Sequence, residues 1–493
     1  MTKLDPQSQM GRQTKKGRPV EAAPNRLHAD RVAVFPRSVD GRFRRLKWAI
    51  MAACLAVYYI TPWLRWNRGA HSPDQAVLLD LAHRRFYMFS IEIWPQEFYF
   101  VAGLLIMAGI GLFLITSAVG RAWCGYACPQ TVWTDLFQHI DRLIDGDRNA
   151  QIKLNNAPWG LAKVARRLLK WTIYAVIGMS TGGAWIFYFA DAPTLARDFV
   201  TLQAPSIAYS TVFVLTVMTV WFGGFMREQV CVYMCPWPRI QSAMLDEKSL
   251  LVTYKDWRGE PRGKKASDGK PLGDCIDCGL CQAVCPTGID IREGPQIGCI
   301  TCALCIDACD GVMKQLGRPR GLIDYATLED SEQEKAGKPA TAHWKLIWHP
   351  RTLVYFGIWS AIGASLLFAL GTRKHISLAV SKDRNPPFMM MSDGGIRNAY
   401  AVRWKNMEGR PRKMVLVLEG VPGAKMWSED MPKDHAAREL TRVIAPDMTL
   451  PLRVYVVAPA GTPEQKLGFT LRALDADGGE DHYSSRFDAP TQE

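Results

Sequence analysis

The chain has 493 residues, of which 48% are hydrophobic and 22% are charged, so it is long enough for two or three structural units and too apolar to be disordered. Its mean hydropathy of −0.07 excludes a protein that lies in the membrane throughout, although a few spans of about 20 apolar residues each would still fit this average. Lys and Arg exceed Asp and Glu by 13, which by itself is compatible with a nucleic-acid partner, an anionic membrane surface or loops held in the cytoplasm.

Several apolar runs are long enough to span a membrane, and the alternative for them is a set of buried helices in a soluble core. Residues 1–46 are polar and basic and contain no apolar core, so we expect no cleavable signal peptide before the first run. The predicted spans are five: residues 48–64, 98–119, 171–190, 207–226 and 353–370.

Basic residues set the expected orientation. They are dense before the first span and in the loop 121–170, whereas the loop 191–206 contains only Arg197. Cytoplasmic loops of membrane proteins carry the excess of Lys and Arg. The charge is therefore mainly a topology signal and not a nucleic-acid signal. The predicted division is a basic cytoplasmic N-terminal segment 1–46, a four-helix transmembrane region 47–245, a cytoplasmic domain 246–344, a fifth transmembrane helix 345–371, and a periplasmic domain 372–493.

Two identical cysteine pairs follow the second and fourth predicted spans. RAWCGYACPQ contains Cys124 and Cys128, and REQVCVYMCPW contains Cys231 and Cys235. The repeated CxYxCP order suggests an internal duplication with a pseudo-twofold relation. Cysteines four apart in a helix lie on one face, and the following proline ends or kinks the helix. Four sulfur ligands at one membrane depth would select Cu(I); the alternative is that these cysteines only pack between helices. Cys54, alone in the first span, is most simply a packing residue.

Eight further cysteines form two phased runs. The first run reads CxxCxxCxxxCP and the second repeats its spacing, which is the pattern of a bacterial ferredoxin with two clusters. In that pattern three cysteines of one run and the fourth of the other hold each 4Fe-4S cluster; zinc would leave a third cysteine surplus in each run. The expected ligand sets are Cys275, Cys278, Cys281 and Cys309 for one cluster, and Cys299, Cys302, Cys305 and Cys285 for the other.

Bound haem is not supported by the histidines. His139, His343 and His349 lie near predicted helix ends, and no two of them share helical spacing within a span. We interpret them as polar residues at the membrane interface.

After Arg373 the sequence changes to short runs that alternate apolar and polar residues, at 399, 413, 453 and 466. This period, with Gly, Pro and Asp between the runs, predicts an antiparallel immunoglobulin-like sandwich without a disulfide bridge. The methionines of the run Phe388, Met389, Met390 and Met391 could offer thioethers to copper, but packing is the simpler interpretation. The predicted fold class is thus a multi-pass α-helical membrane protein with five transmembrane helices, an inserted two-cluster ferredoxin-like α+β domain and a C-terminal all-β sandwich.

Taken together, these motifs resemble the CcoG/FixG/RdxA family of bacterial cytochrome oxidase accessory proteins. The resemblance rests on both CxxxCP motifs, DEKSLLVTYKDWRGEPRG from residue 246, CIDCGLCQAVCPTGIDIREG from 275, CITCALCIDAC from 299, and the closing sandwich. It implies an inner-membrane protein with two 4Fe-4S clusters that reduces Cu(II) to Cu(I) for assembly of a cbb-type oxidase. The four CxxxCP cysteines would then handle copper, and the partners would be membrane lipid, copper ions, oxidase assembly factors or a copper chaperone or transporter, and a second copy in a homodimer.

Two other functions are compatible with the sequence. The chain could be the membrane ferredoxin subunit of a quinol dehydrogenase of the NapH or NosR type, which has similar motifs but is not expected to carry the sandwich. It could also be a scaffold without enzymatic activity, in which the sandwich docks an oxidase subunit and the clusters stabilise the fold.

Overall fold

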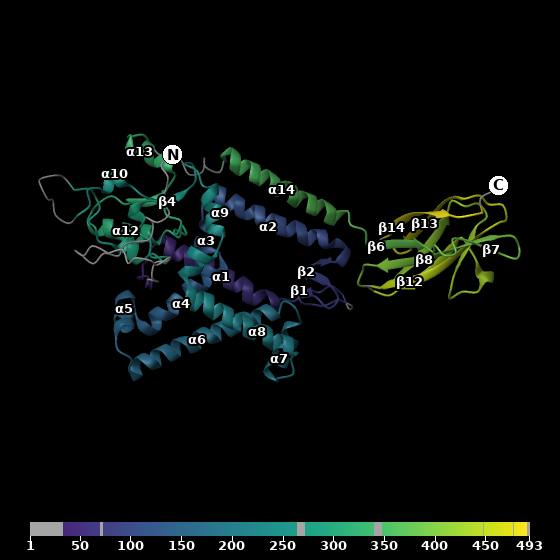
Figure 1. The fold of residues 1–493 in the computed structure, drawn as a ribbon, viewed down its shortest axis with the longest axis horizontal. Helices are drawn as coiled ribbons and strands as arrows, with labels where there is room; N and C mark the ends of the chain where they lie inside the picture. Colours follow the sequence, from purple (N-terminus) through teal and green to yellow (C-terminus); the bar gives the residue numbers. More distant parts are fainter. Residues whose placement is uncertain are drawn as a thin grey trace, which may run out of the picture. The chain divides into compact units, whose positions relative to one another are not determined.

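The structure is a computed structural model that describes residues 33–69, 72–263, 272–339, 348–446, 448–476 and 478–490 (Figure 1). The chain divides into two compact units. The first contains the described residues up to Leu64, together with Val77–His83 and Phe98–Gly363; the second contains Arg65–Ala76, Arg84–Glu97 and the chain from Ala364 onward.

Within the described ranges, four helices are long and apolar enough to cross a membrane. They are α1 (Arg42–Ile60) with the 3-10 turn η1 (Thr61–Trp63), α2 (Phe98–Val119), α8 (Ser206–Thr219) with the π-helix η3 (Val220–Met226), and α14 (Pro350–Gly371). They match four of the five predicted spans, so a count of five is not confirmed.

The remaining predicted span, 171–190, lies on α6 (Leu161–Ile186), which is less apolar because Lys163 and Lys170 occupy its first part. This helix packs closely along α8. A Cβ placed on Gly178 would lie 3.1 Å from the Thr216 carbonyl oxygen, and one on Gly182 would lie 3.0 Å from that of Val212. Gly178 is opposite Thr216, whereas Gly182, one turn later on α6, is opposite Val212, one turn earlier on α8. The two helices are therefore antiparallel, and the glycines allow their close approach.

Shorter helices lie at the ends of these long ones. The cysteine motifs fall on α3 (Ala122–Tyr126) and the π-helix η4 (Val230–Met234), and each is followed by a helix that begins at or just after the motif's proline. The others are α4 (Pro129–Asp145), α5 (Arg148–Asn156), α7 (Ala192–Val200) and α9 (Trp237–Met244).

The ferredoxin-like region is α+β, as predicted. Strands β4 (Leu251–Tyr254) and β5 (Ile323–Ala326) pair antiparallel and close the region at its two chain ends. Buried Val252, Ile306 and Ile323 pack together beneath them. Between the strands lie α10 (Asp256–Gly259), α11 (Leu280–Ala283), η5 (Ile291–Glu293) and α12 (Leu304–Gln315), and α13 (Leu328–Lys335) follows.

The C-terminal part is a sandwich of two antiparallel sheets. One has the strand order β10-β12-β8-β6, with β7 paired to β8, and the other has β11-β9-β13-β14. The four predicted alternating runs are β8 (Ile396–Asn406), β9 (Arg412–Glu419), β12 (Thr449–Ala458) and β13 (Gln465–Ala473). The other strands are β6 (Ile376–Lys382), β7 (Met389–Met390), β10 (Lys425–Ser428), β11 (Glu439–Ile444) and β14 (Glu480–Phe487), with the turn η7 (Lys433–His435) between β10 and β11.

The inward residues of both sheets form one core that includes Trp404, Leu416, Val454 and Phe469. Phe388 packs against this core, whereas Met389 and Met390 are exposed. The second unit also contains the hairpin of β2 (Arg85–Met88) and β3 (Ile91–Ile93), preceding the turn η2 (Pro95–Glu97), while the short strand β1 (Val77–Asp80) belongs to the first unit.

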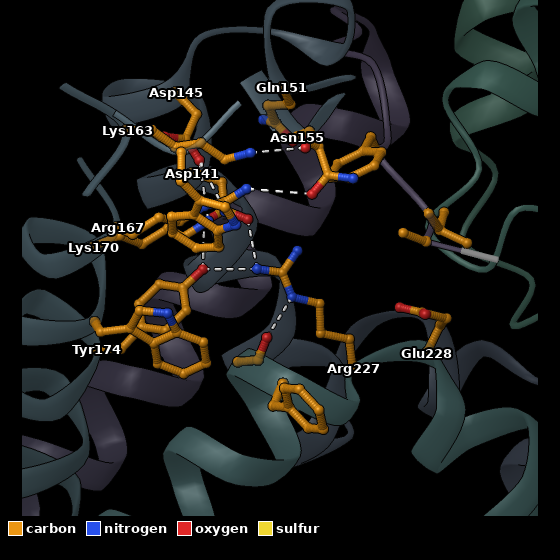
Figure 2. Close-up of a pocket in the computed structure, with 17 residues that line it drawn as sticks. Asp141, Asp145, Gln151, Asn155, Lys163, Arg167, Lys170, Tyr174, Arg227 and Glu228 are labelled. Carbon is orange, nitrogen blue, oxygen red and sulfur yellow. Dashed lines mark hydrogen bonds and ion pairs between the residues drawn. The ribbon is translucent and has the colours of Figure 1, made fainter. Parts of the chain in front are cut away.

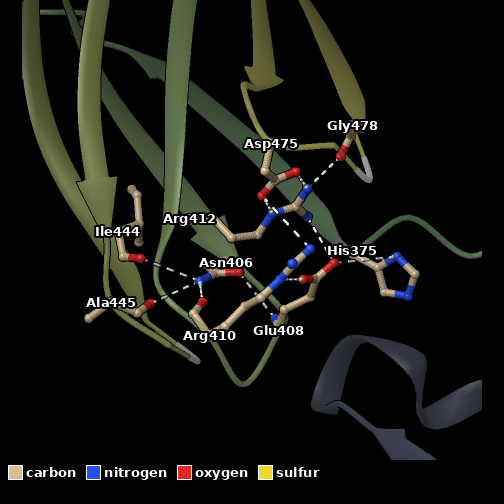
Figure 3. Close-up of polar contacts among 9 residues, drawn as sticks. All are labelled: His375, Asn406, Glu408, Arg410, Arg412, Ile444, Ala445, Asp475 and Gly478. Atoms are coloured by element: carbon tan, nitrogen blue, oxygen red, sulfur yellow. Dashed lines mark hydrogen bonds and ion pairs between the residues drawn. The ribbon is translucent and has the colours of Figure 1, made fainter.

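A buried arginine joins the loops at one end of the sandwich (Figure 3). The side chain of Arg412 is 1% exposed and forms ion pairs with Asp475 and, at 3.0 Å, with Glu408. Asn406 donates hydrogen bonds to the carbonyl oxygens of Arg410, at 2.7 Å, and Ala445, at 3.1 Å. These contacts give hydrogen-bond partners to the buried Arg412 guanidinium and Asn406 amide, which would destabilise the fold if they were buried without partners.

Candidate functional site

Cysteines of both runs line two neighbouring cavities in the ferredoxin-like region. The first cavity contains the side chains of Cys275, Cys278, Cys281 and Cys309, with Leu322 and Ile323 among its apolar walls. The structure thus brings the fourth cysteine of the second run to three cysteines of the first, as the spacing predicts.

The second cavity is lined by Cys285, Cys299, Cys302 and Cys305, and Cys281 also reaches it. Each cavity is lined by its four expected ligands, drawn from both runs, and the second also by Cys281, which fits two similar prosthetic groups.

The two cysteine turns have the same unusual backbone. Asp277 and Gly279 in the first run have φ of +54° and +67°, and the equivalent Thr301 and Ala303 have +57° and +59°. Left-handed backbone is costly for residues other than glycine and occurs mainly where a functional site demands it. The repeated conformation indicates that both turns are shaped to hold the same kind of group.

The chemistry of the thiols agrees with a metal-containing group. Burial raises the pKa of Cys281, Cys299 and Cys309 to about 12. Iron binds thiolates, and several thiolates can be buried together only if positive charge accompanies them. The residues therefore fit iron–sulfur clusters, which would supply that charge.

The first CxxxCP pair lies at the junction of α3 and α4. Cys124 is buried and its thiol donates a hydrogen bond to Gln241 Oε1 at 3.2 Å. Gln241 is fully buried on α9, and its Nε2 donates to Thr116 Oγ1 on α2 at 3.0 Å. Cys128 is the residue before α4, which starts at Pro129.

The second pair lies on a different local structure. Cys231 falls within the π-helix η4 and Cys235 comes directly after it, before Pro236. In both pairs the second cysteine is outside the helix that holds the first, so the expectation of two cysteines on one α-helical face is wrong. The predicted break at each proline is confirmed, since α4 begins at Pro129 and Pro236 directly precedes α9. Proline is favoured at a helix start because the first backbone N–H groups of a helix have no intrahelical acceptor and proline lacks an N–H.

The two pairs are near each other and near a buried arginine. The pKa of Cys231 is raised to about 12. The main cause is burial, and the neighbouring thiols of Cys128, Cys124 and Cys235 add to it. Burial likewise raises the pKa of Cys124 to about 11, although the guanidinium of Arg121 opposes this shift.

Arg121 is 3% exposed, and burial lowers its pKa while Cys124, Cys299, Cys231 and Cys235 raise it. Its Nη1 donates to the Ile297 carbonyl oxygen at 2.6 Å. Arg121 is therefore near both the CxxxCP thiols and Cys299, which lines the second cysteine cavity. Within the described ranges, no three His, Cys, Asp or Glu side chains are grouped closely enough to hold a single metal ion. The convergence of four sulfurs on copper stays a prediction.

The first CxxxCP pair touches the second cysteine run directly. A Cβ placed on Gly125 would lie 2.6 Å from the Ile300 carbonyl oxygen and 3.1 Å from Cys302 Cα. The Tyr126 hydroxyl donates to the Cys302 carbonyl oxygen at 3.2 Å. Cys124 and Cys302 belong to the same buried cluster. By contrast Tyr233, the matching tyrosine of the second motif, is 52% exposed, so the two motifs are not equivalent.

Two residues of this site were not predicted from the sequence. Arg121 could have been found from its place three residues before Cys124, since Arg227 lies similarly, four residues before Cys231. No local signal marks Gln241. The histidines play no visible part: His139 packs edge-on against Trp48, His349 has a buried, unpartnered Nδ1, and His343 lies outside the described residues. Cys54 is partly buried on α1.

Comparison with known proteins gives three matches to family models. A 4Fe-4S dicluster domain matches residues 226–328, a 4Fe-4S binding domain matches 100–146, and the IG-like fold at the C-terminal of FixG matches 366–490. The first two ranges include the two CxxxCP motifs.

Relatives cover nearly the whole chain. Nitrogen fixation protein FixG of Rhizobium meliloti is 54% identical over 94% of this chain and 94% of its own length. Protein RdxA of Cereibacter sphaeroides is 53% identical over 92% and 96%. The crystal structure of a FixG-related protein from Vibrio parahaemolyticus aligns with 24% of this chain and 97% of its own, at 17% identity and a TM-score of 0.20.

Proposed function

The chain belongs to the FixG/RdxA family of iron–sulfur proteins, and from this premise we propose that it is a membrane cupric reductase that serves assembly of a cbb-type cytochrome oxidase. In this proposal electrons pass from the ferredoxin-like region to Cu(II) held at the CxxxCP thiols. The observation that carries it is the direct contact between the first CxxxCP motif, at Gly125 and Tyr126, and the cysteine turn at Cys302.

The proposed ligands of one 4Fe-4S cluster are the four cysteines of the first cavity, and those of the other are Cys285, Cys299, Cys302 and Cys305. Each cluster, when bound, takes up and releases one electron. The protein supplies the eight thiols, the left-handed turns that carry several of them, and a buried cluster that contains both Cys302 and Cys124.

Copper is the substrate in this scheme. The proposed copper-handling and catalytic residues are Cys124, Cys128, Cys231 and Cys235, because soft sulfur ligands favour Cu(I) over Cu(II) and so favour the reduced product. The guanidinium of Arg121 would stabilise negative charge on these sulfurs, and Gln241 would fix the orientation of the Cys124 thiol.

We further propose that α6 is a fifth membrane span. The end of α6 lies with the end of α1, since the Tyr188 hydroxyl, two residues after α6, donates to the Tyr58 carbonyl oxygen at 2.9 Å. The start of α6 lies with the end of α4, since Lys170 pairs with Asp145 at 3.0 Å. A fifth span puts the N-terminus and the ferredoxin-like region in the cytoplasm and the sandwich in the periplasm of the inner membrane. Oxidase assembly factors, a copper chaperone or transporter, and a second copy are the proposed partners.

Anaerobic titration of the dithionite-reduced protein with Cu(II) tests the function. We expect the iron–sulfur absorbance to recover as Cu(I) forms, with one Cu(I) for each electron that the reduced clusters lose. If the protein is only a scaffold, no Cu(I) should form. The C-terminal sandwich favours the reductase over a NapH-type or NosR-type subunit, which is not expected to carry one.

A further inference from the structure

A large pocket opens where α4, α5, α6 and the end of η3 meet, away from the cysteine cavities (Figure 2). The pocket has a volume of about 450 Å³. Three carboxylates line it (Asp141, Asp145 and Glu228), together with four cationic side chains from α6 and from the residue that follows η3. Neither the cluster sites nor the copper thiols include any of these residues.

One of the carboxylates is already satisfied. Asp141 accepts hydrogen bonds from Arg227 and Tyr174 and pairs with Lys170 at 3.3 Å. Burial would raise the pKa of Asp141, but Arg227 and Lys170 outweigh this and hold it below the ordinary value. Asp141 therefore stays ionised, with its charge balanced by Arg227 and Lys170.

Asp145 is different, because only one of its oxygens is used. The residue is 4% exposed, and its Oδ2 pairs with Lys170 at 3.0 Å. Its Oδ1 is buried and has no hydrogen-bond partner. An unmet buried carboxylate oxygen costs free energy, so the site is suited to a ligand with a hydroxyl or amine that donates to Asp145 Oδ1. Glu228, which is 6% exposed, lies apart from the Asp141 cluster (Figure 2).

The mouth of the pocket suits an amphipathic ligand. Trp159 and Trp171 line the pocket and are 76% and 39% exposed, and Leu168, beside Arg167, is 64% exposed. Tryptophan is enriched at membrane interfaces. The four cations and three carboxylates almost cancel, which favours an uncharged head group over a phosphate or a nucleotide.

Two residues of the pocket also line a cavity that contains a proposed copper ligand. Arg227 and Glu228 line a second, smaller cavity together with Cys231, Thr287 and Ile300. Arg227 has φ of +47° at the end of the π-helix η3. Such strain and such π-helical turns are found mainly at functional sites.

We propose that this pocket binds a membrane-dissolved hydroquinone and is the place where electrons enter the protein. The hydroquinone loses two O–H protons and two electrons and leaves as the quinone. Asp145 Oδ1 accepts one proton and Glu228 the other, and both pass them to water. The two electrons go one to each of the two proposed clusters. This rests on the proposed electron-carrying role of the ferredoxin-like region, but not on copper being the final acceptor.

The test uses the full chain in lipid nanodiscs, with oxidised clusters and decyl-ubiquinol as the probe, under anaerobic conditions and without copper. Bleaching of the iron–sulfur absorbance gives the rate. We expect Asp145→Asn to slow it about 100-fold, as loss of a proton acceptor does. Asn155→Trp fills the pocket from α5 and should raise the quinol concentration for half-maximal rate about tenfold or more. Asn156→Trp, on an exposed neighbour that does not line the pocket, is the matched control and should stay within about twofold of wild type.

Each result separates the two proposals. Reduction by dithionite bypasses the pocket, so Asp145→Asn and Asn155→Trp should bleach normally with dithionite and form Cu(I) at the wild-type rate. Unchanged quinol-driven bleaching in both variants overturns the inference. A second outcome also overturns the inference. In it, one phospholipid co-purifies with each protein chain and is lost from Asn155→Trp, while quinol-driven bleaching stays at the wild-type rate. Absence of Cu(I) formation with quinol-driven bleaching intact overturns the cupric reductase function and leaves this inference standing.

Discussion

The Tyr126 hydroxyl donates a 3.2 Å hydrogen bond to the carbonyl oxygen of Cys302. This contact joins a motif at the end of a membrane helix to a proposed cluster ligand 176 residues further along the chain. The neighbouring Gly125 has no side chain, and the cysteine turn occupies the space that one would need.

Gly125→Ala should separate the motif from the cysteine turn. The added Cβ would meet backbone atoms at 2.6 Å and 3.1 Å, which cannot move as a flexible side chain could, and overpacking of this kind costs about 1–3 kcal/mol. We expect Cu(II) reduction by the dithionite-reduced protein to slow by about one to two orders of magnitude. Gly183→Ala is the matched control, because nothing lies within 4 Å of its Cβ position. Equal rates in both variants would mean that this contact does not carry electrons.

Substitutions of the cluster cysteines should fall into two groups. Cys275→Ser and Cys309→Ser should lose the same cluster, because both residues line the first cavity. Cys285→Ser and Cys302→Ser should lose the other. Each variant should retain about half of the iron and sulfide and keep the electron paramagnetic resonance signal of the remaining cluster. Cys54→Ser should keep both. If Cys309→Ser matched Cys302→Ser, the crosswise assignment would be wrong.

Copper binding should become tighter as the pH rises. Burial raises the pKa of Cys124 to about 11 and that of Cys231 to about 12, so both thiols are protonated near neutral pH and Cu(I) must displace the protons. Affinity should increase by about tenfold per pH unit for each proton displaced, until the pH approaches these values. Competition with a Cu(I) chelator between about pH 6.5 and 8.5 measures the slope.

The single variants Cys124→Ser and Cys231→Ser provide the control for that slope. Each should keep its full iron content and lower the slope by one proton. A slope that neither substitution changes would show that these thiols do not bind copper.

The sandwich should lose stability in acid through Asp475. The Arg412 guanidinium holds the pKa of Asp475 below its ordinary value. The resulting stabilisation is present above the ordinary carboxyl pKa of about 3.9 and is lost as the pH falls through the lower folded value. Asp475→Asn should lower the free energy of unfolding by about 1.5–3 kcal/mol at neutral pH, and the difference should shrink in acid. Tryptophan fluorescence during unfolding of the full chain measures it, with the exposed Asp434→Asn as control. A difference independent of pH would contradict the ion-pair argument.

The fifth span can be tested with reporter fusions. Green fluorescent protein joined after Asn156 should fluoresce in the cytoplasm, and alkaline phosphatase joined after Thr201 should be active in the periplasm. The physical reason is that the part of α6 after its last cation, Trp171–Ile186, would extend about 24 Å at 1.5 Å per residue, and the apolar residues 187–190 that follow would complete the crossing of the hydrocarbon core. Cytoplasmic results at both positions would show that α6 lies on one side.

The amino-acid sequence by itself determined the four long apolar helices α1, α2, α8 and α14, the grouping of the eight cysteines around two cavities and the four central strands of the sandwich. These features depend on local order: the length of an apolar run, the step between cysteines, and the alternation of side chains along a strand. The same local information misjudged the CxxxCP motifs, because it could not show that Cys128 and Cys235 fall outside the helices that hold their partners.

Only the tertiary structure decided how these parts meet. The pairing of Cys124 with Gln241 joins residues 117 positions apart, and the contact of Tyr126 with Cys302 joins residues still further apart. The unpartnered oxygen of Asp145 is likewise invisible in the sequence, since it depends on which donors the other helices bring to α4. Burial and hydrogen bonding arise from the packing of distant segments, so the nonequivalence of the two cysteine motifs and the position of the proposed quinol pocket became visible only in the folded chain.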